Sequence, residues 1–111
     1  MVRGFAIVCP SADEDANPAR DGELDMIYTD PDFWGHGVGR ALLAATVDVL
    51  SARGFAEATL WTAEENLRPR RVYEAAGWMR EPLSRERSWR CVQFRELRYR
   101  LVVDLLTAGR E

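Results

Sequence analysis

The chain has 111 residues, a formal net charge of −3 and 47% hydrophobic residues, which predict one domain over residues 1–111 with a single core. No apolar run reaches the ~20 residues that span a bilayer, and the N-terminus lacks a signal-peptide pattern, so we expect a cytoplasmic protein without a membrane partner. The negative charge gives no general attraction for nucleic acid. Cys9 and Cys91 are expected to be free thiols, and a single histidine argues against a metal site.

The first half of the chain predicts a wide hairpin followed by a helix. Residues 2–9 and 23–29 have strand composition, and the polar stretch 10–22 joins them. The apolar side chains of the second strand alternate and are expected on one face: Leu24, Met26 and Tyr28. Residues 38–53 carry an apolar stripe at helical spacing, and Gly54 follows as a natural stop.

The second half continues the alternation of strands and helices. Its segments are a strand, a helix, a short strand, an arginine-rich connection and a final half-buried strand: 56–62, 66–76, 78–81, 82–89 and 94–103. The order β-β-α-β-α-β-β predicts an α/β (mixed α+β) fold, in which helices cover a central mixed sheet.

Three glycines at alternate positions, 35, 37 and 39, lie between the second strand and the first helix. A backbone without side chains lets a diphosphate approach the N–H groups at the positive end of a helix. A dinucleotide-binding loop would place its third glycine one residue later, and a nucleoside triphosphate loop would need a lysine, which this chain lacks. A plain structural turn is the alternative.

The glycine segment resembles motif A of the GCN5-related N-acetyltransferases, Gln/Arg-x-x-Gly-x-Gly/Ala. Residues 34–39 supply both small positions, and Trp34 replaces the usual Gln or Arg, which removes a polar contact to the diphosphate. Residues 66–78 are similar to motif B of the same family. Four residues of that motif stand at the family spacing, with Pro69 and Trp78 in place of alanine and phenylalanine: Asn66, Tyr73, Glu74 and Gly77. The resemblance covers roughly residues 2–103.

The resemblance implies acetyl-coenzyme A as co-substrate, no metal, and a primary amine as acceptor. The coenzyme would lie between the second and third strands, which splay apart in this family, and its pantetheine arm would pair with backbone near Ile27 and Thr29. A backbone N–H near Ile27 or Tyr28 would hold the developing oxyanion. The residues expected to bind the coenzyme are Ile27, Tyr28, Thr29, Trp34, Gly35, His36, Gly37, Val38, Gly39, Arg40 and Asn66.

The same resemblance assigns catalytic roles. Tyr73 would protonate the departing thiolate, although it could simply pack on the sheet. Glu23 or Asp25 could accept the ammonium proton through a water, or be ordinary surface carboxylates. Asn66 could bond the pantetheine arm, cap its helix, or do both, and His36 receives no catalytic role. The arginines and aromatic residues of the stretch 85–100 fit a strand better than a nucleic-acid surface.

Members of this family usually carry a strand, two helices and a further strand before the hairpin that opens this chain. Without these elements residues 2–9 would form a sheet edge with unpaired backbone and exposed apolar side chains. Three alternatives remain open. The chain is part of a longer product, or it dimerises through that edge or by exchanging its last strand, or it binds the coenzyme without efficient transfer. We expect a homodimer and an active N-acetyltransferase, with a non-catalytic coenzyme-binding module as the second hypothesis.

Overall fold

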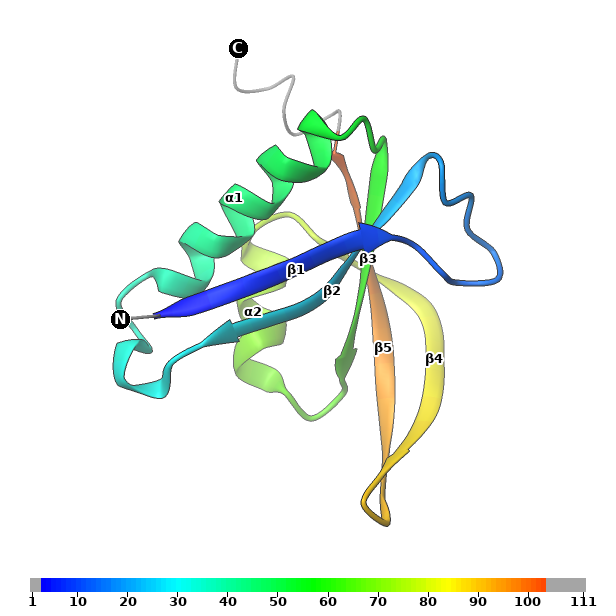
Figure 1. The fold of residues 1–111 in the computed structure, drawn as a ribbon. Helices are drawn as coiled ribbons and strands as arrows, with labels where there is room; N and C mark the ends of the chain where they lie inside the picture. Colours follow the sequence, from blue (N-terminus) through cyan, green and yellow to red (C-terminus); the bar gives the residue numbers. More distant parts are fainter. Residues whose placement is uncertain (1–2, 104–111) are drawn as a thin grey trace.

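The structure, a computed structural model, describes residues 3–103 as a five-stranded sheet with two α-helices. The elements in chain order are β1 (Gly4–Pro10), β2 (Asp21–Thr29), the 3₁₀ turn η1 (Pro31–Phe33), α1 (Val38–Ala52), β3 (Glu57–Ala63), α2 (Leu67–Ala75), β4 (Met79–Trp89) and β5 (Val92–Val102) (Figure 1). This order confirms the predicted succession of strands and helices and the mixed α/β class. No helix in the described range is long and apolar enough to cross a membrane.

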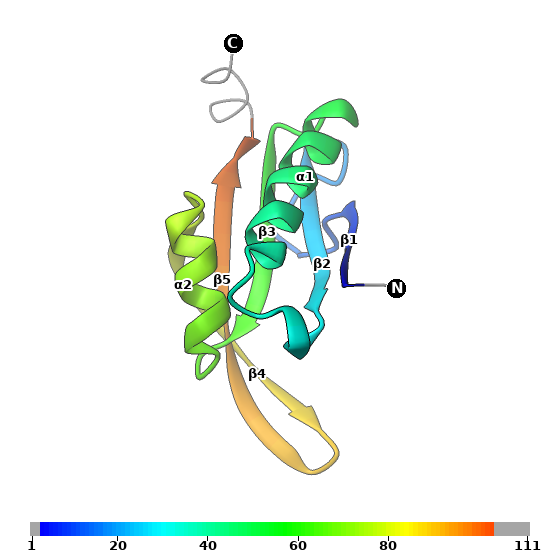
Figure 2. The ribbon, with the colours of Figure 1, turned by 90° about the vertical axis from the view of Figure 1, so that its left-hand side faces the viewer.

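The sheet has the order β1-β2-β3-β5-β4, and both helices cover the same face of it (Figure 2). Only the β2–β3 pair is parallel, and the other three neighbouring pairs are antiparallel. The core lies between the helices and the sheet, and its largest fully buried side chains include Trp78, Tyr99 and Leu43. This arrangement leaves β1 and β4 as the two edges of the sheet.

Strands β2 and β3 separate soon after they begin. Their parallel ladder joins only the first three residues of each strand, 21–23 with 57–59. Beyond that point the two ribbons diverge (Figure 1), as the splayed strands of the family were expected to do. Backbone groups on the facing sides of β2 and β3 are therefore left without ladder partners, which prepares a site for an extended ligand.

The predicted alternation along β2 is wrong, because a β-bulge interrupts it. In the β1–β2 ladder Ile7 lies opposite Met26 and Val8 lies opposite Leu24, so Asp25 is the extra residue. A bulge reverses the side on which the following side chains point. Leu24 is therefore in the core, whereas Met26 and Tyr28 are 50% and 44% exposed on the other face.

The predicted arginine-rich connection over 82–89 is also wrong, since β4 runs through it to Trp89. The register shifts between Arg80 and Ser84, and beyond that shift β4 pairs with β5 up to the hairpin turn. Cross-strand ion pairs hold this part of β4, in place of the alternating apolar residues by which a strand is normally recognised in a sequence. Arg85 lies 2.8 Å from Glu96, and Arg95 lies 3.0 Å from Glu86. Charged pairs directly across a ladder stabilise strands that contain few hydrophobic residues.

Candidate functional site

The glycine turn has a backbone conformation that requires glycine at two positions. Gly35 and Gly37 have φ angles of +85° and +80°, in the left-handed region that costs other residues about 1–2 kcal/mol. Gly39 is not required by the fold in this way, because a Cβ added there would make an ordinary van der Waals contact of 3.5 Å with Thr29 Oγ1. The third glycine therefore leaves this stretch of backbone bare without relieving a clash within the fold.

The amides of this turn are open to a ligand. Helix α1 begins at Val38, and its N-cap residue, Gly37, has no side chain that could bond the first amides. Five amides of the turn and of the first helical residues have no hydrogen-bond acceptor among residues 3–103: those of Gly35, Gly37, Val38, Gly39 and Arg40. We call these five amides the cradle. Unsatisfied amides at a helix N-terminus attract anions through both hydrogen bonding and the helix dipole.

Two of the residues expected to bind the coenzyme do not contribute to the cradle. The amide of His36 donates to the carbonyl of Phe33 at 3.2 Å, so it is not free to bind an anion in this conformation. Trp34, which was expected to bind the coenzyme without the usual polar contact to the diphosphate, lines the cleft beside the turn and donates its indole N–H to the carbonyl of Thr29 at 3.0 Å. Trp34 thus ties the turn to β2.

Arg68 is a site residue that sequence reasoning missed. Its guanidinium carbon lies 5.0 Å from the centroid of the Trp34 ring, in a cation–π contact. The cradle, Arg40, Arg68 and the first turn of α2 line a cleft of about 830 Å³. Arg68 occupies a variable position of motif B, so its only sequence signal was its place in the first turn of the helix.

The end of β2 directs alternate backbone groups into the gap beside β3. The amide of Asp30 donates to the carbonyl of Arg3 at 2.8 Å, so alternation along the ladder makes Phe5–Tyr28 a hydrogen-bonded pair as well. The N–H and C=O groups of Ile27 and Thr29 then point away from β1. This agrees with the expected pairing at these two residues, and it excludes the amide of Tyr28 as an oxyanion donor.

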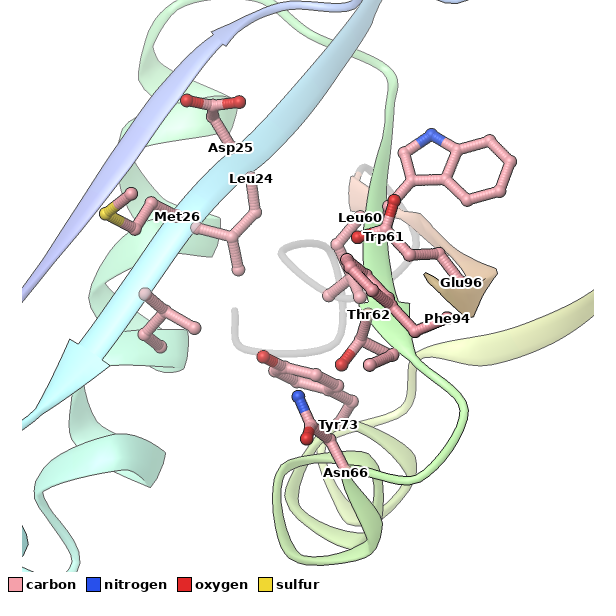
Figure 3. A pocket seen from close by; sticks show the side chains of 12 residues that line it. Leu24, Asp25, Met26, Leu60, Trp61, Thr62, Asn66, Tyr73, Phe94 and Glu96 are labelled. Carbon is pink, nitrogen blue, oxygen red and sulfur yellow. The ribbon is translucent and has the colours of Figure 1, made fainter. Parts of the chain in front are cut away.

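A second cavity of about 270 Å³ lies between β2 and β3. It shares Ile27, Asn66 and Tyr73 with the cleft that holds the cradle. Figure 3 shows the Tyr73 ring and the Asn66 amide entering this gap from the side of α2. The two cavities therefore meet where Tyr73 lies, which is the arrangement needed for a long ligand whose reactive end approaches a second substrate.

Tyr73 is both a core residue and a potential proton donor. Its side chain is 7% exposed, and its ring centroid lies 6.1 Å from that of Tyr99. Burial raises the pKa of Tyr73 to about 12, so its hydroxyl is protonated at neutral pH. No other residue of the described range accepts or donates a hydrogen bond at that hydroxyl. Asn66 precedes α2 as its N-cap residue but makes no side-chain capping bond, which leaves its amide available to a ligand.

The two candidate bases occupy different places. Glu23 pairs with Thr59 where the strands are still joined, and it does not line the cavity, whereas Asp25 does. Burial and the nearby carboxylates of Asp13 and Asp25 raise the pKa of Glu23. Glu96 also lines the cavity, but its carboxylate is held by Arg85. Glu23 and Asp25 form no ion pair within the described range.

Aromatic side chains from β3 and β5 complete this cavity, and sequence reasoning had not assigned them to it. Trp61 and Phe94 line it, and the indole N–H of Trp61 donates to Asp13 at 3.1 Å. The loop between β1 and β2 thereby reaches across the face that the helices leave bare. In residues 3–103 no three His, Cys, Asp or Glu side chains are grouped as metal ligands would be, and both cysteines are free thiols.

Comparisons with known proteins agree with this geometry. The sequence model of the acetyltransferase (GNAT) family matches residues 2–78, more than half of the chain. A mycothiol acetyltransferase of Beutenbergia cavernae is 42% identical over 60 residues, which cover 54% of this chain and 20% of that protein. The chain thus spans about a fifth of the length of the curated relatives it matches.

Two solved structures share the fold. The ribosomal-protein-S18-alanine N-acetyltransferase of Escherichia coli is 26% identical, with a TM-score of 0.71 over 91% of this chain and 61% of that one. A putative acetyltransferase of Salmonella typhimurium, solved with its cofactor acetyl-CoA, is 18% identical, with a TM-score of 0.79 over 92% of this chain and 58% of that one. The cradle, the splayed strands and the matched residues lead to one conclusion: the chain belongs to the acetyltransferase (GNAT) family.

Proposed function

We propose that this protein transfers an acetyl group from acetyl-coenzyme A to a primary amine, by direct attack while both substrates are bound. The single observation that carries the proposal is the cradle of five unengaged amides, at the mouth of a cleft that leads to Tyr73. A diphosphate is the part of the coenzyme that such a turn binds best. Arg40 and Arg68 line the same cleft and add positive charge there.

The gap between β2 and β3 fits the pantetheine arm. Ile27 and Thr29 would exchange hydrogen bonds with its amides, as an added strand does. Asn66 faces the same cleft and would bond the arm from the side of α2. With the arm in this position the acetyl group would lie near Ile27, whose N–H would stabilise the developing oxyanion, an effect worth several kcal/mol in other acyl transfers.

Tyr73 would act as the general acid. When the amine nitrogen bonds to the acetyl carbon, the carbon–sulfur bond breaks and the leaving thiolate takes a proton from the Tyr73 hydroxyl. That hydroxyl is protonated at neutral pH and lies where the two cavities meet. A positioned proton donor contributes about 10²–10⁴-fold to rate in comparable reactions.

Glu23 and Asp25 would receive the acceptor. Both are carboxylates without an ion-pair partner in the described range, so together they attract a cationic amine. Asp25 lines the cavity and would hold the ammonium. Glu23, whose pKa is raised, would take the ammonium proton through a water, since a base works best with a pKa near the operating pH.

A second function is a coenzyme-binding module without efficient transfer, and one observation favours it. The Thr29 carbonyl, one of the groups that would pair with the pantetheine arm, already accepts a hydrogen bond from Trp34. A carbonyl has two lone pairs and can accept twice, so this contact weakens coenzyme pairing without blocking it. We keep acetyl transfer as the function and propose, with it, a cytoplasmic location, a single domain and a homodimer.

Two measurements on the full chain test the proposal. Acetyl-coenzyme A should raise the melting temperature in a thermal-shift titration. Release of coenzyme A thiol, followed with a thiol-reactive dye, should then depend on an added amine from a panel of small amines, aminoglycosides and peptides with free N-termini or lysines. Stabilisation without thiol release for any amine would favour the binding module. No stabilisation by the coenzyme would refute both functions.

A further inference from the structure

The two edges of the sheet differ in how they are protected. Edge strand β4 contains Pro82, a register shift between Arg80 and Ser84, and alternating charged side chains. These are features by which natural edge strands avoid pairing with another sheet. Edge strand β1 has the sequence GFAIVCP, with no charged residue and with its only proline at the last position.

The outer hydrogen-bonding groups of β1 can be assigned. At its two ends the amide of Asp30 donates to Arg3 at 2.8 Å and the amide of Ser11 donates to Asp21 at 2.9 Å. Odd-numbered residues of β1 therefore bond β2, and the even-numbered ones present their backbone outward. Three outward amides, those of Gly4, Ala6 and Val8, have no acceptor among residues 3–103.

We propose that a second copy of this chain pairs with β1, antiparallel about a two-fold axis, with Ala6 opposite Ala6 of the partner subunit. In this register Gly4 pairs with the partner's Val8, so all three outward amides of each strand find carbonyl acceptors. Moving the two-fold axis by one residue, to Ile7, would shift the register by two residues and place Gly4 opposite the partner's Pro10, which has no N–H to donate. The ten-stranded sheet that results has no unprotected edge.

Side chains on the face that the helices leave bare support the same register. Phe5 and Ile7 are 41% and 44% exposed, on the side opposite α1, because a Cβ at Gly4 would point at Leu42 and Val38 of that helix. The pairing sets Phe5 against the partner's Ile7. Aromatic and β-branched side chains directly opposite one another add about 0.2–1 kcal/mol per pair.

The charges that flank the two ends of β1 are complementary under the two-fold axis, which favours a second copy as the occupant. Arg3 would lie opposite the partner's Cys9. In each chain partial burial raises the pKa of the Cys9 thiol, and the nearby carboxylates of Glu23 and Asp25 raise it further. The basic end of one strand thus meets the acidic end of the other, twice by symmetry. This inference does not depend on the proposed acetyl transfer.

Sedimentation velocity of the full chain tests the interface. We expect a dimer for the wild type, and Ala6→Pro should weaken it about tenfold or more, because the two central hydrogen bonds are lost. Ile7→Lys should weaken it as well, by placing a charge against the partner's Phe5. Val49→Lys is the matched control, since Val49 is 40% exposed but lies on α1, and it should leave the dimer intact. A wild-type monomer, or a dimer that survives Ala6→Pro and Ile7→Lys, would overturn the proposal.

Cysteine cross-linking tests the register. In a background with Cys9→Ser and Cys91→Ser, oxidation of a mixture of the Phe5→Cys and Ile7→Cys proteins should give a disulfide-linked dimer, because these positions lie opposite each other. Neither protein alone should cross-link efficiently. Self-linking of the Ile7→Cys protein would instead place the axis at Ile7 and refute the register, and no cross-link in the mixture would refute the pairing.

Discussion

Replacing Tyr73 with phenylalanine separates its two roles, because the change removes one hydroxyl and keeps the ring. The ring belongs to the core, whereas the hydroxyl has no hydrogen-bond partner in the described structure. The free energy of unfolding should therefore change by less than about 0.5 kcal/mol. Turnover should fall about 10²–10⁴-fold, which corresponds to about 3–5 kcal/mol of transition-state stabilisation. Affinity for acetyl-coenzyme A should stay nearly constant.

The assay combines steady-state release of coenzyme A thiol at saturating amine, a coenzyme titration by thermal shift, and urea unfolding. Tyr99→Phe is the matched control, because the Tyr99 hydroxyl donates to Glu74 at 2.6 Å and accepts from Arg70 at 3.1 Å. The control should lose about 1 kcal/mol of stability with little effect on turnover. Equal turnover of Tyr73→Phe and wild type would remove Tyr73 from the acid role.

The free energy of unfolding of Tyr73→Phe should also differ from that of the wild type at alkaline pH. The pKa of Tyr73 is about 12 in the fold and about 10 in an unfolded chain. A raised pKa gives stability that is fully present below pH ~10 and is lost as the pH rises through the folded value. The wild type should therefore lose up to about 3 kcal/mol relative to Tyr73→Phe across this window, as measured by urea unfolding at several pH values.

Three further predictions concern the cradle, the base and the missed arginine. Gly37→Asp should abolish coenzyme binding in the thermal-shift assay. The control is Gly54→Asp, at another left-handed glycine with φ +83°, which should destabilise the fold by about 1–2 kcal/mol and still bind the coenzyme. Equal coenzyme binding by both variants would refute the role of the cradle. Glu23→Gln should raise the melting temperature at pH 7, because the raised pKa of Glu23 shows that its half-buried charge is unfavourable in the fold. The gain should vanish below the ordinary pKa near 4.5. A gain that persists at low pH would contradict this cause. Arg68→Ala should weaken coenzyme binding about tenfold, and the loss should be larger at low salt than at high salt. Arg71→Ala should leave the affinity for the coenzyme unchanged. Identical affinities of the Arg68→Ala and Arg71→Ala variants would remove Arg68 from the site.

The element order and the site motifs could be predicted from the sequence because they depend on local signals. The backbone at positions 35 and 37 is left-handed and therefore favours glycine. A glycine can be read directly from the sequence, so this local feature could be predicted. The helix over 38–53 followed from its apolar stripe, and α1 occupies Val38–Ala52. The separation of β2 from β3 was expected from the family resemblance alone.

The errors came from interactions between segments far apart in the chain. The bulge at Asp25 depends on how β1 pairs with β2, and nothing in the residues 23–29 reveals it. Strand β4 is held by ion pairs to β5 such as Arg85–Glu96, so its own composition looked like a connection. Arg68 joined the site only because α2 packs close enough for a contact with Trp34.

Nuclear magnetic resonance of the backbone amides during coenzyme titration tests the central claim most directly. Coenzyme A should shift the five cradle amides, at residues 35 and 37–40, while pantetheine, which lacks the diphosphate, should shift Ile27 and Thr29 but leave the cradle unchanged. The amide of His36, already bonded to Phe33, should respond least within the turn. Saturable coenzyme binding that leaves all five cradle amides unshifted would contradict the account.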